Sequence, residues 1–148
     1  MFRLIKMTIY YFDFGGTISN GKYRKKDILK DKLPRKALRE KYLNPKAFGM
    51  IQKLKSRGFT LGIITNTNCT YIQVIKILKK LGIRSYFKNV IVSCKSKEKG
   101  CYFKKPNRII FDYARSLHPR AKKFVYIGND YENDFKYLGD YGWDAKLI

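Results

Sequence analysis

The chain has 148 residues, and its 33 Lys and Arg against 11 Asp and Glu give a formal net charge of +22. This length predicts one domain. Hydrophobic residues make up 45% of the chain and aromatic residues 16%, enough to form a core and to exclude intrinsic disorder as the main state. No apolar run approaches the ~20 residues of a membrane span, and the opening residues lack the features of a cleaved signal peptide. We therefore expect a soluble, cytoplasmic protein without a transmembrane segment.

Cysteine and histidine are too scarce to form several common kinds of site. The three cysteines, Cys69, Cys94 and Cys101, form no CxxC pair, so we expect them to be reduced and to bind no zinc. His118 is the single histidine. Mechanisms that need a histidine cluster or a Ser/His/Asp triad are therefore disfavoured.

The first expected element is a buried strand. Its apolar residues are Leu4-Ile5 and then Thr8-Ile9-Tyr10-Tyr11-Phe12, and it ends at Asp13-Phe14-Gly15-Gly16, where two glycines permit a sharp turn.

Strand and helix patterns then alternate to the last residue. In chain order we predict a helix from Pro45 to Gly58 with Asn44 as its cap, a strand at 59–65, a helix over 72–81 capped within 66–68, a strand at 90–92, a helix after Asn107, a strand at 124–127, a short helix at 132–138 and a strand at 145–148. This alternation implies right-handed βαβ crossovers. The predicted fold is an α/β three-layer sandwich with a mostly parallel, Rossmann-like sheet.

In such sheets ligands bind outside the carboxyl ends of the strands. The segments to examine for function are therefore Asp13 to Thr17, Thr65-Asn66 and Gly128-Asn129-Asp130.

A strongly basic segment follows the first of these loops. Residues 22–46 contain 11 Lys and Arg and three acids, a local net charge of +8. The segment is too short for a separate domain, and its few apolar residues favour at most two weakly amphipathic helices. We expect a loop or a small flap there.

Four motifs in order resemble those of the haloacid dehalogenase (HAD) superfamily, in its phosphatase-like branch. They are Asp13-Phe14-Gly15-Gly16-Thr17, Thr65-Asn66, Lys105-Pro106 at the start of a helix, and Gly128-Asn129-Asp130-Tyr131-Glu132-Asn133-Asp134. The resemblance covers nearly the whole chain and implies a single HAD-like domain over 1–148. Residues 18–43 correspond to the place where that superfamily inserts a cap, so the cap here is small or absent.

The resemblance implies a role for each motif. Asp13 is the expected nucleophile, because a carboxylate is ionised at neutral pH and forms a labile acyl phosphate. Thr65 and Lys105 complete the expected catalytic set by holding and balancing the phosphoryl charge. Gly16, Thr17 and Asn66 are the expected substrate-binding residues.

A magnesium ion is the implied cofactor. It requires about six oxygen ligands, and those expected come from Asp13, the backbone carbonyl of Gly15, Asn129 and Asp130. Asp134 is expected to pair with Lys105 behind this group.

Two positions depart from the family pattern. Gly15 stands where the family usually has an aspartate that acts as general acid and base, help worth ~10²- to 10⁴-fold, and Asn129 replaces the usual metal-binding aspartate. Three interpretations follow: a magnesium-dependent phosphatase that forms an aspartyl-phosphate, a weakened module that binds phosphate or nucleic acid without turnover, and a metal-free dehalogenase.

The net charge also predicts acidic partners. Besides a phosphorylated substrate, a nucleic-acid end or another polyanion fits the basic segment with its interleaved Tyr23, Tyr42 and Phe48. The oligomeric state does not follow from the sequence.

Overall fold

The computed structural model describes residues 7–95 and 100–148. Its strands form one sheet in the order β3-β2-β1-β4-β5, and every neighbouring pair is parallel. The strands are β1 (Thr8–Phe12), β2 (Thr60–Thr65), β3 (Asn89–Val92), β4 (Lys123–Gly128) and β5 (Asp144–Leu147). The predicted α/β fold with a parallel sheet is confirmed. The predicted start of the first strand at Leu4-Ile5 lies outside the described residues.

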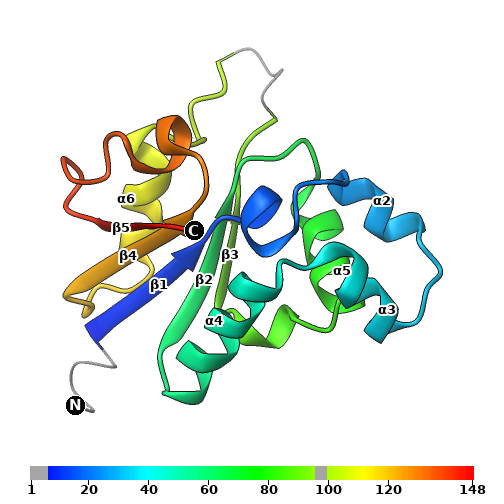
Figure 1. Cartoon of the computed structure of the whole chain (residues 1–148). Coiled ribbons are helices and arrows are strands. Elements are labelled where there is room, and N and C mark those ends of the chain that lie inside the picture. Colours follow the sequence, from blue (N-terminus) through cyan, green and yellow to red (C-terminus); the bar gives the residue numbers. More distant parts are fainter. Residues whose placement is uncertain (1–6, 96–99) are drawn as a thin grey trace.

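Helices cover both faces of the sheet (Figure 1). They are α2 (Lys25–Lys30), α3 (Arg35–Tyr42), α4 (Pro45–Ser56), α5 (Tyr71–Lys80) and α6 (Arg108–Ser116), with short helical turns η1 (Phe14–Ile18), η2 (Arg84–Tyr86) and η3 (Tyr131–Phe135). Helices α4 and α5 lie against one face and α6 against the other, which gives the three layers.

Each face of the sheet has its own apolar core. Successive residues of a strand point to opposite faces, so Phe12 packs in the cluster that contains Ile51 of α4 and Ile77 of α5. Its neighbour Tyr11 packs in the cluster that contains Phe111 of α6. Burial on both faces explains why the strands read as nearly continuous apolar runs.

Several helix ends differ from the sequence-based expectation. The Asn44 cap of α4 is confirmed, since its side chain accepts a hydrogen bond from the Lys46 N–H. The predicted cap of α5 within 66–68 is wrong, because Thr70 forms a reciprocal capping box with Gln73. The short helix predicted at 132–138 is the turn η3 followed by further turns. Helix α6 begins at Arg108, directly after Asn107 as predicted, and not at the Lys105-Pro106 pair.

Most of the basic segment lies in a small helical unit, residues 19–43, which we call the insert. A β-bridge between Ser19 and Leu43 closes its base, and it contains α2 and α3. Arg39 of α3 donates from Nε to the carbonyl of Leu81 at 2.7 Å and from Nη2 to that of Gly82 at 2.9 Å. The last carbonyls of a helix lack intrahelical partners and favour cations, so this arginine docks the insert on the end of α5.

The expectation of reduced cysteines is wrong for two of the three. Cys94 and Cys101 form a disulfide, whereas Cys69 is free and buried. The Cys94 N–H donates to the Phe103 carbonyl at 3.0 Å, which brings the two ends of this loop together. The sequence did not indicate the pairing because both cysteines lie within one loop and form no CxxC motif.

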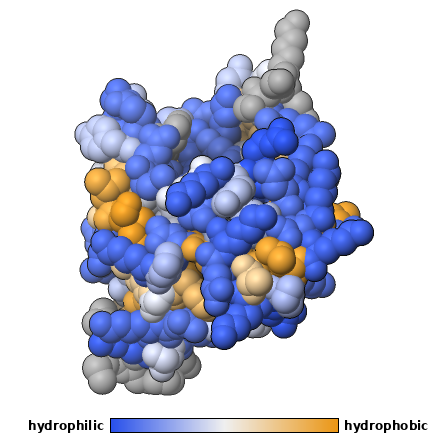
Figure 2. Space-filling view, turned by 45° about the vertical axis from the view of Figure 1, so that its right-hand side comes forward, coloured by the Kyte–Doolittle hydropathy of each residue, from blue (hydrophilic) through white to orange (hydrophobic). Residues whose placement is uncertain are grey.

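No helix within residues 7–95 and 100–148 is long and apolar enough to span a bilayer. Figure 2 shows a largely hydrophilic surface with small hydrophobic patches, viewed with the side that carries the insert turned forward.

Candidate active site

The site lies at the carboxyl edge of the sheet, where β1 runs between β2 and β4. Phe12 is level with Ile63 of β2 and with Ile127 of β4. The residues that follow these strands therefore emerge together, and the Asp13 N–H still donates to the Ile127 carbonyl at 2.9 Å. The parallel register brings the strand-end segments singled out from the sequence to one place.

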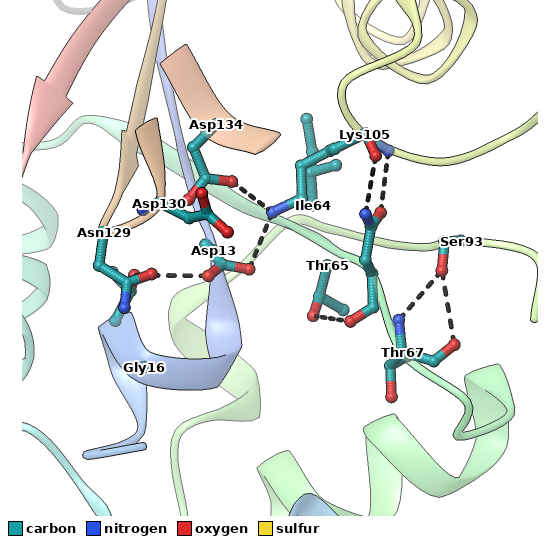
Figure 3. Close-up of polar contacts among 12 residues, drawn as sticks. Asp13, Gly16, Ile64, Thr65, Thr67, Ser93, Lys105, Asn129, Asp130 and Asp134 are labelled. Carbon is teal, nitrogen blue, oxygen red and sulfur yellow. Dashed lines mark hydrogen bonds and ion pairs between the residues drawn. The ribbon is translucent and has the colours of Figure 1, made fainter. Parts of the chain in front are cut away.

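Lys105 is the centre of a buried charge network (Figure 3). Its ammonium lies 2.9 Å from Asp13 Oδ1 and 2.8 Å from Asp134 Oδ1. Lys105 is 3% exposed and Asp134 1% exposed, so both charges are removed from water. One ammonium between two carboxylates fixes the orientation of Asp13, because moving any of the three would leave a buried charge uncompensated.

Tyr126 of β4 completes this network, and no sequence motif indicated it. Its hydroxyl accepts from the Lys105 ammonium and donates to the Ile64 carbonyl at 2.9 Å. Complete burial, with Asp13 and Asp134 adding to it, raises the pKa of Tyr126 well above its ordinary value, so the phenol stays neutral. In the sequence it was one more aromatic residue in an apolar strand.

Asn66 positions the lysine loop through the backbone. Its side-chain amide donates to the Lys105 carbonyl and accepts from the Lys105 N–H, both at 2.9 Å. Thr65, the residue before it, is fully buried, and its hydroxyl donates to the Asn66 carbonyl at 3.5 Å. The structure thus ties the end of β2 to the loop that carries Lys105.

The turn after β1 fits closely against the loop after β4. Gly16 has φ of +76°, and a Cβ there would collide with the Asn129 amide, so both the backbone conformation and the space favour glycine. Thr17 is buried, and its hydroxyl lies 3.5 Å from Asp13 Oδ2 and 3.3 Å from Asn129 Oδ1. Thr17 therefore links the nucleophile candidate to Asn129.

Two adjoining cavities open at this edge of the sheet. The smaller, about 260 Å³, we call the inner pocket; it is lined by Asp13, Gly15, Lys25, Asn66, Lys105, Asn129, Asp130 and Asp134. The larger, about 760 Å³, we call the outer cavity; it includes Gly16 and several residues of the insert. Seven of the predicted site residues thus share one pocket, whereas Thr17 and Thr65 are buried beside it.

Burial also changes the acid–base properties of the nucleophile candidate. Loss of hydration raises the pKa of Asp13, and Lys105 opposes this rise. Burial thus disfavours the ionised form that nucleophilic attack requires, and the ammonium groups of Lys105 and Lys25 offset part of this effect.

Lys25, at the start of α2, also reaches the inner pocket, and the sequence did not single it out within its basic run. Its Nζ lies 3.2 Å from the position that a Cβ of Gly15 would take. Burial lowers the pKa of Lys25, and Asp13 opposes this shift. The pocket thus receives one cation from the core and one from the insert.

The sequence profile of the haloacid dehalogenase-like hydrolase family matches residues 17–137. The chain belongs to this family. It is 33% identical over 105 residues to a glyceraldehyde 3-phosphate phosphatase of Methanothermobacter thermautotrophicus, in a match that covers 70% of this chain and 43% of the relative. The chain thus spans less than half the length of that relative.

Solved structures share this fold over almost the whole length of the chain. An uncharacterized protein of Listeria monocytogenes serotype 4b superposes with a TM-score of 0.71 at 25% identity, covering 95% of this chain and 78% of that one. A D,D-heptose 1,7-bisphosphate phosphatase of B. bronchiseptica, complexed with magnesium and phosphate, has a TM-score of 0.69 at 15% identity and covers 95% and 80%. The latter likeness concerns the fold.

Proposed function

We propose that this HAD protein is a phosphohydrolase that works through a phosphorylated Asp13. The observation that carries the proposal is the placement of Asp13 at the end of the central strand, held 2.9 Å from the Lys105 ammonium at the edge of an open pocket. The phosphatase name of the Methanothermobacter relative supports the same reaction class.

In the first step an Asp13 carboxylate oxygen attacks phosphorus. The bond from phosphorus to the leaving oxygen breaks, and its electron pair departs with that oxygen. Lys105 stays hydrogen-bonded to the other side of the Asp13 carboxylate and balances the charge gathered there. Thr65 and Asn66, at the end of β2, and Gly16 with Thr17, at the turn after β1, are proposed to hold the phosphoryl oxygens.

In the second step water attacks phosphorus of the acyl phosphate. The bond between phosphorus and Asp13 breaks, the carboxylate is regenerated, and both protons of the water remain with inorganic phosphate as H₂PO₄⁻. The covalent route is advantageous because it replaces one difficult displacement with two easier ones, through a labile acyl phosphate.

The donors around Asp13 suit a hard cation, so Mg²⁺ remains part of the proposal. Asp13, Gly15, Asn129 and Asp130 all line the inner pocket, and each has an oxygen that could serve as a ligand. Mg²⁺ is usually bound by one or two carboxylates with water and substrate phosphate. In the described part of the chain, no three His, Cys, Asp or Glu side chains form a metal-binding group by themselves. When bound, the ion would neutralise charge on the transferring phosphoryl group.

The test is phosphate release from 4-nitrophenyl phosphate, acetyl phosphate, glyceraldehyde 3-phosphate and a 5′-phosphorylated oligonucleotide, each with and without Mg²⁺. Asp13→Asn is expected to remove all measurable release, and acid-quenched wild-type protein is expected to carry phosphate on Asp13 by mass spectrometry. Asp144→Asn is the matched control, because Asp144 is a surface residue paired with Lys123.

The competing interpretations give different results in this assay. Saturable phosphate binding without release would support the binding module. Halide release from a 2-haloacid that depends on Asp13 and not on Mg²⁺ would support the dehalogenase.

The nucleic-acid partner stays a prediction. The two phosphatases similar to this chain are named for small phosphorylated substrates. Part of the positive charge of the insert, including Arg35 and Arg39, docks it on α5. A steep salt dependence of oligonucleotide binding, flattened by replacing Lys25, Lys26, Arg35 and Lys36 with Ser, is the result that would support it.

A further inference from the structure

We propose that Lys25 of the insert binds the leaving-group oxygen of the substrate, in the space that a side chain at position 15 would occupy. The inference rests on the proposed phosphohydrolase function and assigns one residue of that site a new role.

The first observation is the place of Lys25 between the two cavities. Among the described residues, only Gly15, Lys25 and Asn129 line both the inner pocket and the outer cavity. A phosphoryl group in the smaller cavity would have Asp13 on one side. Since attack and departure are roughly in line, the leaving group would extend past this junction into the outer cavity.

The second observation is that position 15 leaves room for the ammonium. Gly15 has an ordinary φ of −67°, so backbone conformation does not require glycine there. The Lys25 Nζ lies 3.2 Å from where its Cβ would be, and a larger residue would meet this ammonium directly. The absence of a side chain at position 15 therefore lets a cation from the insert enter the pocket.

The third observation is that the ammonium is held in place without forming an ion pair, although the Asp13 carboxylate acts on it electrostatically. Lys25 and Ile28 lie three residues apart on one face of α2, and Ile28 is buried in the core beside α5. Among the described residues Lys25 Nζ forms no hydrogen bond or ion pair; its contact is with the Phe14 ring, at 5.9 Å from the centroid. A partly buried cation without an ion-pair partner is costly, and an anionic oxygen at the junction would relieve that cost.

The outer cavity fits a negatively charged leaving group. Arg24, Lys25, Lys26 and Lys30 line it, against the single acid Asp27, which already pairs with Arg24. In the first step the leaving oxygen takes the electron pair of its bond to phosphorus and departs as an anion, hydrogen-bonded to the Lys25 ammonium. The step balances without a proton, so the assignment favours substrates whose leaving oxygen is stable as an anion.

The test measures kcat/KM for aryl phosphates from dinitrophenyl to phenyl phosphate, in wild type, Lys25→Met, Lys25→Arg and the control Lys32→Met. Lys32 is an exposed lysine of the insert that lines neither cavity. Losing the ammonium is expected to cost about 10²-fold with phenyl phosphate, the usual effect of removing one charge-stabilising donor. The loss should be much smaller with dinitrophenyl phosphate, whose leaving group needs little stabilisation.

A residue with only a structural role would lower all the rates by one factor, so the readout is the slope of rate against leaving-group pKa. Lys25→Met should steepen this slope, whereas Lys25→Arg and Lys32→Met should leave it near the wild-type value. An unchanged slope in Lys25→Met would overturn the assignment and leave the phosphohydrolase intact. If Lys25→Met does not fold, Lys25→Arg provides the test: a slope as steep as expected for loss of the charge would overturn the assignment in the same way. A wild-type protein inert toward every ester would overturn both.

Discussion

The two lysines that line the inner pocket are held in opposite ways. Lys105 comes from the core, is almost fully buried, and contacts Asp13, Asp134 and the Tyr126 hydroxyl. Lys25 comes from the insert, is half-buried, and has no ion-pair partner among the described residues. The first cation is fixed because two buried carboxylates need it, so it orients the nucleophile. The second is available to a ligand, and its position depends on how firmly the insert is docked.

The largest expected effect is that of removing the fixed cation. Lys105→Met leaves Asp13 and Asp134 buried without a counter-charge, and breaking such a buried pair typically costs about 3–5 kcal/mol. We expect a loss of that order in the free energy of unfolding, measured by urea denaturation, together with loss of phosphate release. Adding Asp134→Asn should recover part of the stability without restoring activity. Full stability in the single variant would contradict the proposed network.

Loosening the insert should act on Lys25 and spare Lys105. Arg39→Met removes two charge-assisted hydrogen bonds to the carbonyls at the end of α5; we expect a loss of about 1–2 kcal/mol, because these bonds are partly exposed. Activity toward phenyl phosphate should fall more than activity toward dinitrophenyl phosphate. The matched control is Arg57→Met, at the exposed end of α4. An equal fall for both esters would mean that docking does not position Lys25.

The smallest expected effect is a pH dependence of the insert. Asp31 accepts hydrogen bonds from the Lys41 ammonium at 2.8 Å and the Tyr42 hydroxyl at 2.7 Å. These two bonds, of which the one from Lys41 has the larger effect, hold the pKa of Asp31 well below its usual range. Since the folded pKa is depressed, the stabilisation is present above the unfolded value of about 4 and is lost as the pH falls through the folded value. Wild type should therefore exceed Asp31→Asn in stability at pH 6, measured by urea denaturation. This advantage should decrease progressively as the pH falls below about 4. A difference independent of pH would contradict the assignment.

The fold could be predicted from the sequence because strands and helices are marked by patterns among neighbouring residues. Buried strands such as Thr8–Phe12 read as continuous apolar runs, helices such as Pro45–Ser56 show a cap and helical spacing, and their alternation leaves few topologies. It also indicated which residues lie at the strand ends, and the structure places Asp13, Asn66 and Asn129 at one pocket. Less was predictable where a side chain has several available partners, as at the start of α5 and in the Cys94–Cys101 loop.

The sequence thus specified the α/β architecture and the edge of the sheet where the candidate site lies, because hydrophobic periodicity and strand-end positions follow from chain order. Which charges meet depended on the tertiary structure. Tyr126 looked like a core aromatic and Lys25 like one lysine of a basic run, yet Tyr126 hydrogen-bonds with Lys105 and Lys25 lines the pocket beside Asp13. Charge interactions depend on distance and burial across segments far apart in the chain, and neither quantity can be read from composition or spacing.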